Sequence, residues 1–327
     1  MLPARAPAAH NESIAAHFST WPETGSPAGY FSTPLGDDAV AFYLDNGFLV
    51  VEGAFDAGEV QALNDETLAI CRGERGEFAG IEPVKPGETD QDVVRKYLCI
   101  HFPHKVSPAM TAQIAHPSIV GSLTKLIGPN VKCMQSMLFV KASGKPGQAW
   151  HQDEDYIPTR DRSLTGVWLA LDDATTENGC LWVIPGSHRP GVLWPMHFHE
   201  DTRFDCAWES YDFPYRDEDA VPVEVRAGTL VVFNGYTLHR SLPNKAPDGF
   251  RRALVNHYMS AESLLPWLWP SEPTGIATHD HRDIVLIAGK DPYAYKGTAD
   301  LMKPHVRPDG EGGCVDGVRK DRDAGYG

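Results

Sequence analysis

The sequence lacks the features that mark secreted and membrane-spanning proteins. No apolar run is long enough to cross a bilayer, and the first residues contain no continuous apolar segment of the kind found in signal peptides. The six cysteines are scattered and form no CxxC pair, which favours buried free thiols over disulfides. They are Cys71, Cys99, Cys133, Cys180, Cys206 and Cys314. Together these absences predict a cytoplasmic protein with no membrane contact.

Positive charge is also scarce. The chain has 29 Lys and Arg residues against 44 Asp and Glu residues, and its formal net charge is -15. A nucleic-acid partner requires a basic surface, so we expect none, and an electrostatic grip on anionic membranes is disfavoured for the same reason. The hydrophobic fraction of 42% is ample for a packed core. The composition therefore predicts a globular protein, and it leaves the oligomeric state open.

Composition divides the chain into three parts. Residues 1–33 are rich in Ala, Pro, Ser and Gly and show no periodicity, which predicts a flexible N-terminal arm. Residues 34–290 carry the periodic segments and are expected to form one domain. Residues 291–327 are polar and Gly-rich, and we expect them to form a C-terminal tail.

Helices are predicted mainly in the N-terminal third of the chain. Apolar spacing and capping residues favour helices over 36–46 and 56–71. Pro108 and Pro117 each stand at a position typical of the first residue of a helix. These helices are expected to pack on the outside of the domain.

Beyond residue 130 the sequence changes to short strands separated by Gly and Pro turns. This spacing favours a sandwich or barrel of the jelly-roll kind, with its core at about 131–260. The strands expected along the whole chain are 48–51, 93–102, 131–141, 165–171, 180–184, 223–225, 229–233 and 252–259. The predicted fold class is therefore mainly β with flanking α-helices.

A histidine and an aspartate stand two residues apart, at His151 and Asp153. Alternate side chains on a strand share one face, so the two can bind one ion together. If His239 folds back beside them, the chain holds two histidines and one carboxylate. Non-haem Fe(II) oxygenases use this set and leave the other coordination positions open. The tripeptide alone is weak evidence, and a buried histidine that is hydrogen-bonded to a nearby aspartate is the more common reason for it.

An arginine follows twelve residues after His239, and two strands joined by the 243–249 loop are expected to bring it back beside that histidine. The planar guanidinium of Arg251 can hold a carboxylate through two hydrogen bonds, and 2-oxoglutarate carries such a carboxylate at its distal end. Ser241 lies on the same strand face as His239 and can add a hydrogen bond. Arg252 alternates to the opposite face and is the alternative candidate for this role.

Other interpretations stay open at this point. His197 with His199, and His279 with His281, also have ligand-like spacing, but both pairs lie outside the predicted strands. A cupin-type metalloenzyme that does not use 2-oxoglutarate commonly has three histidine ligands and needs no arginine anchor. A non-catalytic binding protein of the same fold needs neither an intact metal site nor an anchor.

An ordered series of motifs extends the pattern along the chain. The motifs are MQSMLFVK at 134–141, WHQD at 150–153, GVWLALD at 166–172, ENGCLWVIPGSH at 177–188, HRSLPN at 239–244 and FRRAL at 250–254. In this order they resemble the phytanoyl-CoA dioxygenase family of Fe(II)/2-oxoglutarate-dependent oxygenases, and the resemblance extends over 36–290.

The resemblance implies a double-stranded β-helix, which is a cupin-like jelly roll. It implies that His151, Asp153 and His239 bind iron. It also implies that Arg251 and Ser241 bind the distal carboxylate of 2-oxoglutarate. Further residues expected near this co-substrate are Trp168, Met137, Gln135 and Lys96, the last as the nearest match to a family lysine on an earlier strand.

The resemblance also implies a reaction. Fe(II) is the expected cofactor, and 2-oxoglutarate and O2 are the expected co-substrates. The expected reaction is hydroxylation of an unactivated C–H bond of a small molecule, with release of succinate and CO2. Radical halogenases of this fold lack the carboxylate ligand, so Asp153 favours hydroxylation or a related oxidation. The substrate wall is expected to include Tyr156, His101 and Trp208, the last in the aromatic-rich segment 197–216.

Overall fold

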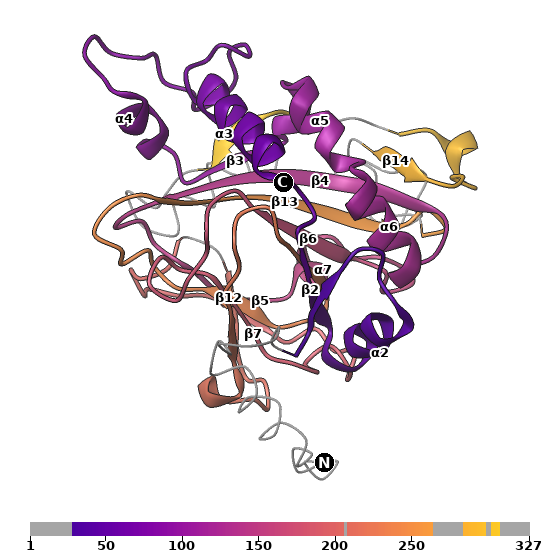
Figure 1. The fold of residues 1–327 in the computed structure, drawn as a ribbon. Helices are drawn as coiled ribbons and strands as arrows, with labels where there is room; N and C mark the ends of the chain where they lie inside the picture. Colours follow the sequence, from indigo (N-terminus) through magenta and orange to yellow (C-terminus); the bar gives the residue numbers. More distant parts are fainter. Residues whose placement is uncertain (1–27, 206–207, 264–283, 299–301, 308–327) are drawn as a thin grey trace, which may run out of the picture.

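The computed structural model describes residues 28–205, 208–263, 284–298 and 302–307. In this part of the chain a larger β-sheet faces a smaller one, and helices cover the outer side of the larger sheet (Figure 1). The prediction of a mainly β fold with helices packed outside it is therefore confirmed. The strands form a sandwich of two sheets rather than a closed barrel.

Four helices begin at or next to the residue that the sequence indicates, namely α2 (Asp37–Asn46), α3 (Ala57–Cys71), α5 (Pro108–Ile114) and α6 (Pro117–Leu126). Two more, α4 (Asp90–Arg95) and α7 (Asp153–Tyr156), were not predicted. Asp56 caps α3, because its carboxylate accepts a hydrogen bond from the Glu59 amide at 2.9 Å and the Glu59 carboxylate accepts one from the Asp56 amide at 2.8 Å. Helix α2 ends at Gly47, whose φ of 80° is one that glycine adopts without strain.

The strand predicted over 93–102 is wrong for most of its length. The segment begins inside helix α4, and only Cys99–His101 forms a strand, β3. The cause is a second capping box: the Thr89 hydroxyl accepts from the Asp92 amide at 3.2 Å, and the Asp92 carboxylate accepts from the Thr89 amide at 3.0 Å. This helix start outweighs the apolar alternation that follows it.

The larger sheet contains nine strands of the described residues. Besides β3, they are β1 (Tyr30–Ser32), β2 (Phe48–Glu52), β4 (Val131–Ala142), β6 (Thr165–Ala170), β11 (Leu230–Asn234), β13 (Phe250–Ser260), β14 (Val285–Ala288) and β15 (His305–Arg307). Their order is β1-β2-β11-β6-β13-β4-β3-β15, and β14 also pairs with β4. Long pairings of β13 with both β4 and β6 form the centre of the sheet.

The smaller sheet contains four strands in the order β10-β7-β12-β5. They are β10 (Val221–Val223), β7 (Leu181–Val183), β12 (His239–Ser241) and β5 (Gln148–His151). A separate hairpin of β8 (Met196–Phe198) and β9 (Trp208–Ser210) follows β7 in the chain. The smaller sheet therefore carries both predicted histidine ligands on neighbouring strands.

Both ends of the described chain contribute strands beyond the bounds 34–290 that composition indicated. Strand β1 pairs in parallel with β2, and it lies within the segment expected to be an arm. Strand β15 pairs antiparallel with β3, and it lies within the segment expected to be a tail. The larger sheet is thus completed by residues from both flanking segments.

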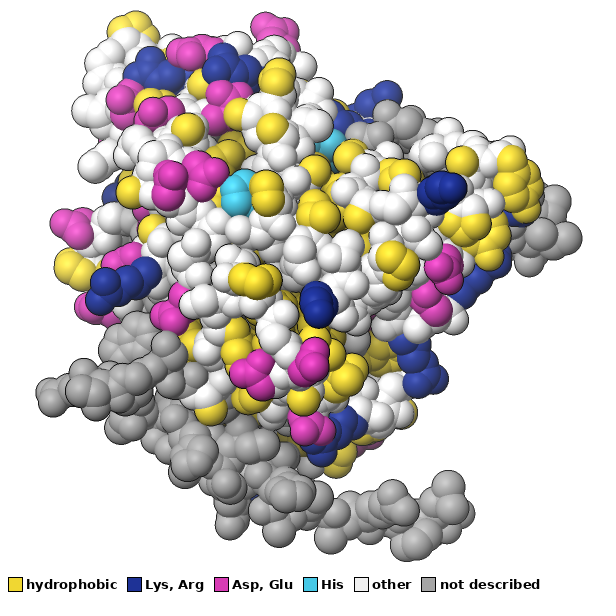
Figure 2. Space-filling view, turned by 45° about the vertical axis from the view of Figure 1, so that its right-hand side comes forward, with side chains coloured by type: hydrophobic (Ala, Val, Ile, Leu, Met, Phe, Trp, Pro, Cys, Tyr) yellow, Lys and Arg dark blue, Asp and Glu magenta, His cyan; other side chains and the backbone are white. Residues whose placement is uncertain are grey.

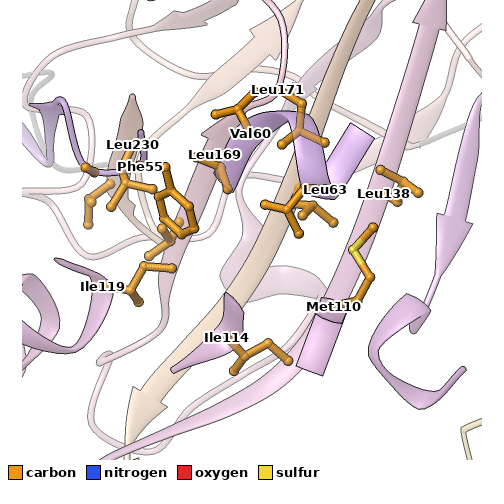
Figure 3. Close-up of a cluster of buried hydrophobic side chains, with 14 of the residues drawn as sticks. Phe55, Val60, Leu63, Met110, Ile114, Ile119, Leu138, Leu169, Leu171 and Leu230 are labelled. Atoms are coloured by element: carbon orange, nitrogen blue, oxygen red, sulfur yellow. The ribbon is translucent and has the colours of Figure 1, made fainter. Parts of the chain in front are cut away.

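Alternation along the strands gives the larger sheet two different faces. On β4, Leu138 and Val140 belong to one apolar cluster with side chains of α3, α5 and α6. Figure 3 shows Leu138 within this cluster. On the same strand, Met137, Phe139 and Lys141 point to the opposite side and line a pocket facing the smaller sheet. The outer face therefore anchors the helices, while the inner face is available for chemistry.

The surface carries charges of both signs. On the face drawn in Figure 2, acidic, basic and apolar side chains are interspersed rather than gathered by type. Among the described residues, none of the helices has the length and apolar character needed to cross a membrane.

We predict that Gly147→Ala destabilises the protein by about 1–3 kcal/mol, because overpacking forces the backbone to shift. A Cβ on Gly147 would stand 2.1 Å from the Ser241 carbonyl oxygen, so strands β5 and β12 would have to separate. The control is Gly121→Ala in α6, where nothing lies within 4 Å and alanine should stabilise the helix by about 0.5–1 kcal/mol. Urea unfolding measures both. Equal effects of the two substitutions would contradict the close approach of β5 to β12.

Candidate active site

Three predicted ligands converge on one point between the sheets. His151 ends β5, His239 begins β12, and Asp153 is the first residue of α7. One possible ligand atom from each residue lies within 4.8 Å of the others. The Nε2 atoms of His151 and His239 are each 3.6 Å from Oδ1 of Asp153. All three side chains are buried.

The position of Asp153 depends on the residue before it. The sequence argument placed His151 and Asp153 on one strand, whereas the strand ends at His151 and Asp153 opens a helical turn. Gln152 keeps an extended backbone, so the two side chains still point the same way. Its side-chain amide donates to the carbonyl oxygens of Tyr236 at 2.8 Å and Val192 at 3.0 Å. These bonds fix the turn beside the metal ligands.

Backbone carbonyls set the orientation of both imidazoles. Nδ1 of His151 donates to the carbonyl of Ala149 at 2.8 Å, and Nδ1 of His239 donates to the carbonyl of Thr237 at 3.0 Å. Each Nε2 is then the unprotonated nitrogen and faces the other ligands. Burial first, and the neighbouring His239 second, lower the pKa of His151 to about 3, so the ring is neutral. Neutral imidazoles are the form that binds a metal ion.

A fourth residue, His257, holds the carboxylate. Its Nε2 lies 2.9 Å from Oδ2 of Asp153, which leaves Oδ1 directed at the two ligand histidines. Burial alone would raise the pKa of Asp153, but His257 and the ligand histidines outweigh it and lower the pKa below its usual value. The sequence argument missed His257. The feature that could have identified it is its even spacing from Arg251 along β13, which puts both residues on the inner face of the sheet.

The arrangement fits a divalent iron ion. Two imidazole nitrogens and one carboxylate oxygen face a common point from one side. This donor set is the 2-His-1-carboxylate facial triad of Fe(II) oxygenases. Within the described residues, this is the one group of three His, Cys, Asp or Glu side chains arranged to hold a metal ion.

Two buried cations lie in the same pocket. Arg251 on β13 and Lys141 on β4 are direct cross-strand partners, and each is only 2% exposed. The Lys141 ammonium donates to the Ser241 hydroxyl and to the Leu242 carbonyl, both at 2.8 Å. The Arg251 guanidinium lies over the ring of Trp168, 5.4 Å from its centroid. Neither cation forms an ion pair within the described residues, and Nε of Arg251 has no hydrogen-bond partner there.

Burying two like charges together is unfavourable without an anion. Burial first, and the charge of Arg251 second, lower the pKa of Lys141 well below its ordinary value. Burial lowers the pKa of Arg251 to about 10. A dianionic ligand would offer a hydrogen-bonding and ionic partner to both side chains. This end of the pocket is therefore suited to binding a carboxylate.

The structure separates the two neighbouring arginines. Arg252 points away from the pocket and pairs with Asp172, with guanidinium–carboxylate distances of 2.6 and 2.8 Å. Arg251 faces inward. The sequence argument expected a hairpin to return Arg251 beside His239, but β12 and β13 belong to different sheets. The two residues therefore face one another across the sandwich.

The structure does not bring Lys96 to the pocket. It caps the C-terminus of α4, and its ammonium lies 2.7 Å from the Glu88 carboxylate. Lys141 is the lysine beside Arg251 instead. Lys96 was chosen because 93–102 was expected to be a strand, and the capping box at Thr89 removes that premise.

The remaining predicted residues divide between the pocket and its surroundings. Trp168, Met137 and Ser241 line the pocket together with the three ligands. Gln135 is buried on β4 opposite His257 and does not line it.

Three residues were predicted for the substrate wall. The ring of Tyr156 lies edge-on to that of His151, with centroids 6.2 Å apart. His101 stacks on His305 with centroids 4.7 Å apart, on the inner side of β3. Trp208 packs on Phe198 in the β8–β9 hairpin, with centroids 4.0 Å apart.

The alternative histidine pairs form no comparable centre among the described residues. His197 lies on the hairpin with its Nε2 3.5 Å from the Glu209 carboxylate, and neither it nor His199 belongs to a three-ligand group. His279 and His281 lie outside the described residues.

The amino-acid sequence is similar to one protein family and to several of its members. The sequence profile of the family described as "Phytanoyl-CoA dioxygenase (PhyH)" matches residues 43–253. Phytanoyl-CoA dioxygenase 1 of Oryza sativa subsp. japonica is 32% identical over 270 residues, which cover 72% of this chain and 92% of that protein.

Solved structures share the fold. The apo structure of the non-heme monooxygenase ThoJ is 20% identical, covers 87% of this chain and 95% of its own, and has a TM-score of 0.60. EvdO2 from Micromonospora carbonacea var. aurantiaca, complexed with 2-oxoglutarate, is 24% identical over 73% of this chain and 95% of its own, with a TM-score of 0.55. The profile match and the rice relative confirm the resemblance noted in the motifs: the chain belongs to the phytanoyl-CoA dioxygenase family.

Proposed function

We propose that this protein is an Fe(II)- and 2-oxoglutarate-dependent dioxygenase that hydroxylates an unactivated C–H bond of a small molecule. One observation carries the proposal. A facial set of His151, Asp153 and His239 opens into the same pocket as two buried cations that lack an ionic partner among the described residues. A metal site alone or an anion site alone would suit many proteins. A pocket that contains both sites suits a ligand that binds metal at one end and carries a carboxylate at the other.

The residues divide the work of binding. His151, Asp153 and His239 would hold Fe(II), and Arg251, Lys141 and Ser241 would hold the distal carboxylate of 2-oxoglutarate. Trp168 packs against the guanidinium and limits its movement. Met137 lines the pocket and shields its polar groups from water. Gln135 supports this wall from the next inward position on β4.

Iron in such a site supplies the oxidation itself, coupling O2 reduction to decarboxylation of 2-oxoglutarate and to hydroxylation of the substrate, with succinate and CO2 as co-products. The chain supplies orientation and exclusion of water. Nδ1 bonds to Ala149 and Thr237 keep each imidazole in the metal-binding tautomer. His257 prevents Asp153 from rotating its second oxygen into the site.

The pocket disfavours the cupin-type alternative without 2-oxoglutarate. Such an enzyme gains nothing from an arginine and a lysine buried side by side. The third ligand is also a carboxylate rather than a histidine.

We also propose a cytoplasmic location. The described cysteines Cys71, Cys99, Cys133 and Cys180 are free thiols, which is usual in a reducing compartment. The substrate is proposed to be a small molecule, and His101 and Trp208 are kept as candidates for its outer contacts.

We predict that Asp153→Ala abolishes stoichiometric binding of Mn(II), used as a redox-inert substitute for Fe(II), because one of three ligands is lost. His197→Ala should leave one bound ion per chain, since His197 lies outside the triad. Electron paramagnetic resonance titration measures the free ion. The activity is tested by measuring oxygen-dependent release of succinate in the presence of Fe(II) and 2-oxoglutarate. A screen of a metabolite pool then identifies the substrate by its mass gain of one oxygen. Stoichiometric Mn(II) in Asp153→Ala would refute the ligand assignment.

We predict that Arg251→Gln raises the Kd for 2-oxoglutarate by about 100-fold, as expected for losing charge-assisted hydrogen bonds in a buried site. Arg252→Gln should change it by less than about threefold, because that guanidinium is paired with Asp172 outside the pocket. Calorimetric titration of the Mn(II)-loaded protein measures both constants. Similar weakening by both variants would remove the distinction between the two arginines.

We predict that 2-oxoglutarate binding takes up a proton through Lys141. Burial and Arg251 lower the pKa of this amine in the free protein, and a bound carboxylate raises it again. Between the two pKa values the complex holds one more proton than its components, so affinity falls as pH rises from the lower value to the higher one.

Titration in two buffers of different ionisation enthalpy measures this uptake. Lys141→Gln should abolish it, whereas Lys96→Gln should preserve it, because Lys96 is paired with Glu88 outside the pocket. Uptake that survives in Lys141→Gln would assign the proton to another group.

A further inference from the structure

The inner face of the larger sheet extends beyond the co-substrate site. On β15, His305 is paired with His101 and Arg307 with Cys99, and these in turn are paired with Met137 and Phe139 of β4. Residues directly opposite one another in a sheet point to the same side. Because Phe139 lines the pocket, Arg307 lies at its level on the same face, two strands further along.

Arg307 meets an aspartate that comes from a third part of the chain. Its Nη2 lies 3.2 Å from Oδ1 of Asp205, and the two side chains are 10% and 3% exposed. Asp205 lines the pocket together with His151 and Asp153. The backbone amide of Asp205 donates to the Gly147 carbonyl at 2.8 Å, which fixes the residue to the start of β5. A charged pair is therefore built into the wall beside the metal ligands.

Tyr156 lies behind this wall, and the charges of Arg307 and Asp205 act on its hydroxyl. Tyr156 ends the helical turn that Asp153 begins, and its ring lies edge-on to His151. The hydroxyl oxygen is buried and has no hydrogen-bond partner among the described residues. Burial raises its pKa, and the charges of Arg307 and Asp205 also act on it, so the hydroxyl stays protonated in their vicinity. A buried hydroxyl without a partner costs free energy until a ligand pairs with it.

Resting on the proposed function, we infer that the substrate carries a hydroxyl or amine group close to the carbon that is oxidised. Asp205 accepts a hydrogen bond from that group, and the Tyr156 hydroxyl is its second partner. Arg307 is a positioning residue that holds the Asp205 carboxylate in the wall and balances its charge.

The chemistry of the wall excludes the alternatives. A plain hydrocarbon segment would leave the Tyr156 hydroxyl unpaired and would bury a carboxylate against carbon. A substrate carboxylate or phosphate at this place has no proton to donate to the Asp205 carboxylate. An O–H or N–H group donates to the carboxylate, and its oxygen or nitrogen lies within the range of a tyrosine hydroxyl, which both donates and accepts.

The test uses the full-length protein loaded with Mn(II) and 2-oxoglutarate. Four probes of one ring size are compared: cyclohexanol, cyclohexylamine, cyclohexanone and cyclohexanecarboxylate. Proton relaxation by Mn(II) reports which probes bind next to the metal. The alcohol and the amine should bind about tenfold more tightly than the ketone and the carboxylate, the effect of one hydrogen bond to a charged acceptor. The alcohol and amine arms show which donor the wall prefers.

Variants show which residues cause the tighter binding of the alcohol and the amine. Asp205→Asn should reduce this preference over the ketone and the carboxylate about tenfold, and Tyr156→Phe should reduce it several-fold for the alcohol. Arg307→Gln should also reduce it, whereas Arg307→Lys, which keeps the positive charge, should restore part of it. Glu209→Gln is the matched control, because it removes an acid from the adjacent hairpin that contacts His197 instead. Affinities for Mn(II) and 2-oxoglutarate should stay within about twofold in the Tyr156 and control variants.

The outcomes separate this inference from the proposed function. Wild-type protein that binds neither Mn(II) nor 2-oxoglutarate overturns the proposed function. Protein that binds both, but relaxes all four probes equally or none of them, overturns only the inference about the substrate. An unchanged donor preference in Asp205→Asn overturns it as well. If that variant loses Mn(II), the comparison of Tyr156→Phe with Glu209→Gln decides the same question.

Discussion

The pairing of β5 with β12 is the constraint on which the site depends. It sets His239 directly opposite His151 in the smaller sheet, so two ligands that are far apart in sequence become cross-strand neighbours. Asp153 then needs only one extended residue to reach the same point. The absence of a side chain at Gly147 allows the two backbones to approach this closely. The metal centre is thus a property of strand register, and a slip of one residue would turn His239 away from it.

The larger sheet contributes the charged side chains that lie opposite the metal ligands. Its strand β13 presents Arg251 and His257 on one face, six residues apart, so one strand serves both ends of the pocket. His257 fixes the carboxylate ligand, while Arg251 and Lys141 leave a positive potential at the other end. The site recognises a ligand by its length as well as its charges, because the ligand must reach from the cation pair to the metal ion. The two sheets therefore select the co-substrate together, and neither sheet could do so alone.

Sequence reasoning anticipates the arrangement where local spacing determines it. The His151–Asp153 spacing, the alternation that separates Arg251 from Arg252 and the mainly β fold could all be read locally, whereas the place of His239 came from the resemblance to the family. Sequence reasoning failed where the outcome depends on which segments become neighbours. Lys96 was favoured through a strand that a helix cap replaces, while Lys141 was overlooked within a motif already quoted. The contribution of β15 to the sheet has no local signal, because a three-residue polar strand resembles a tail until its partner β3 is known.

The two halves of the pocket differ in how the chain builds them. The metal and co-substrate side rests on strands of both sheets, and the three metal ligands, Lys141, Ser241 and Arg251 all fall within the segment 43–253 that matches the family. The substrate side draws on pieces outside the central strands: the turn at Tyr156, the loop at Asp205 and the edge strand at Arg307. Arg307 lies beyond the matched segment. A central sheet that holds the oxidising chemistry can stay constant while peripheral pieces change, since the latter carry little of the core. Substrate choice in this protein is therefore expected to depend on the contact between Asp205 and Arg307, where two peripheral pieces meet next to the metal site.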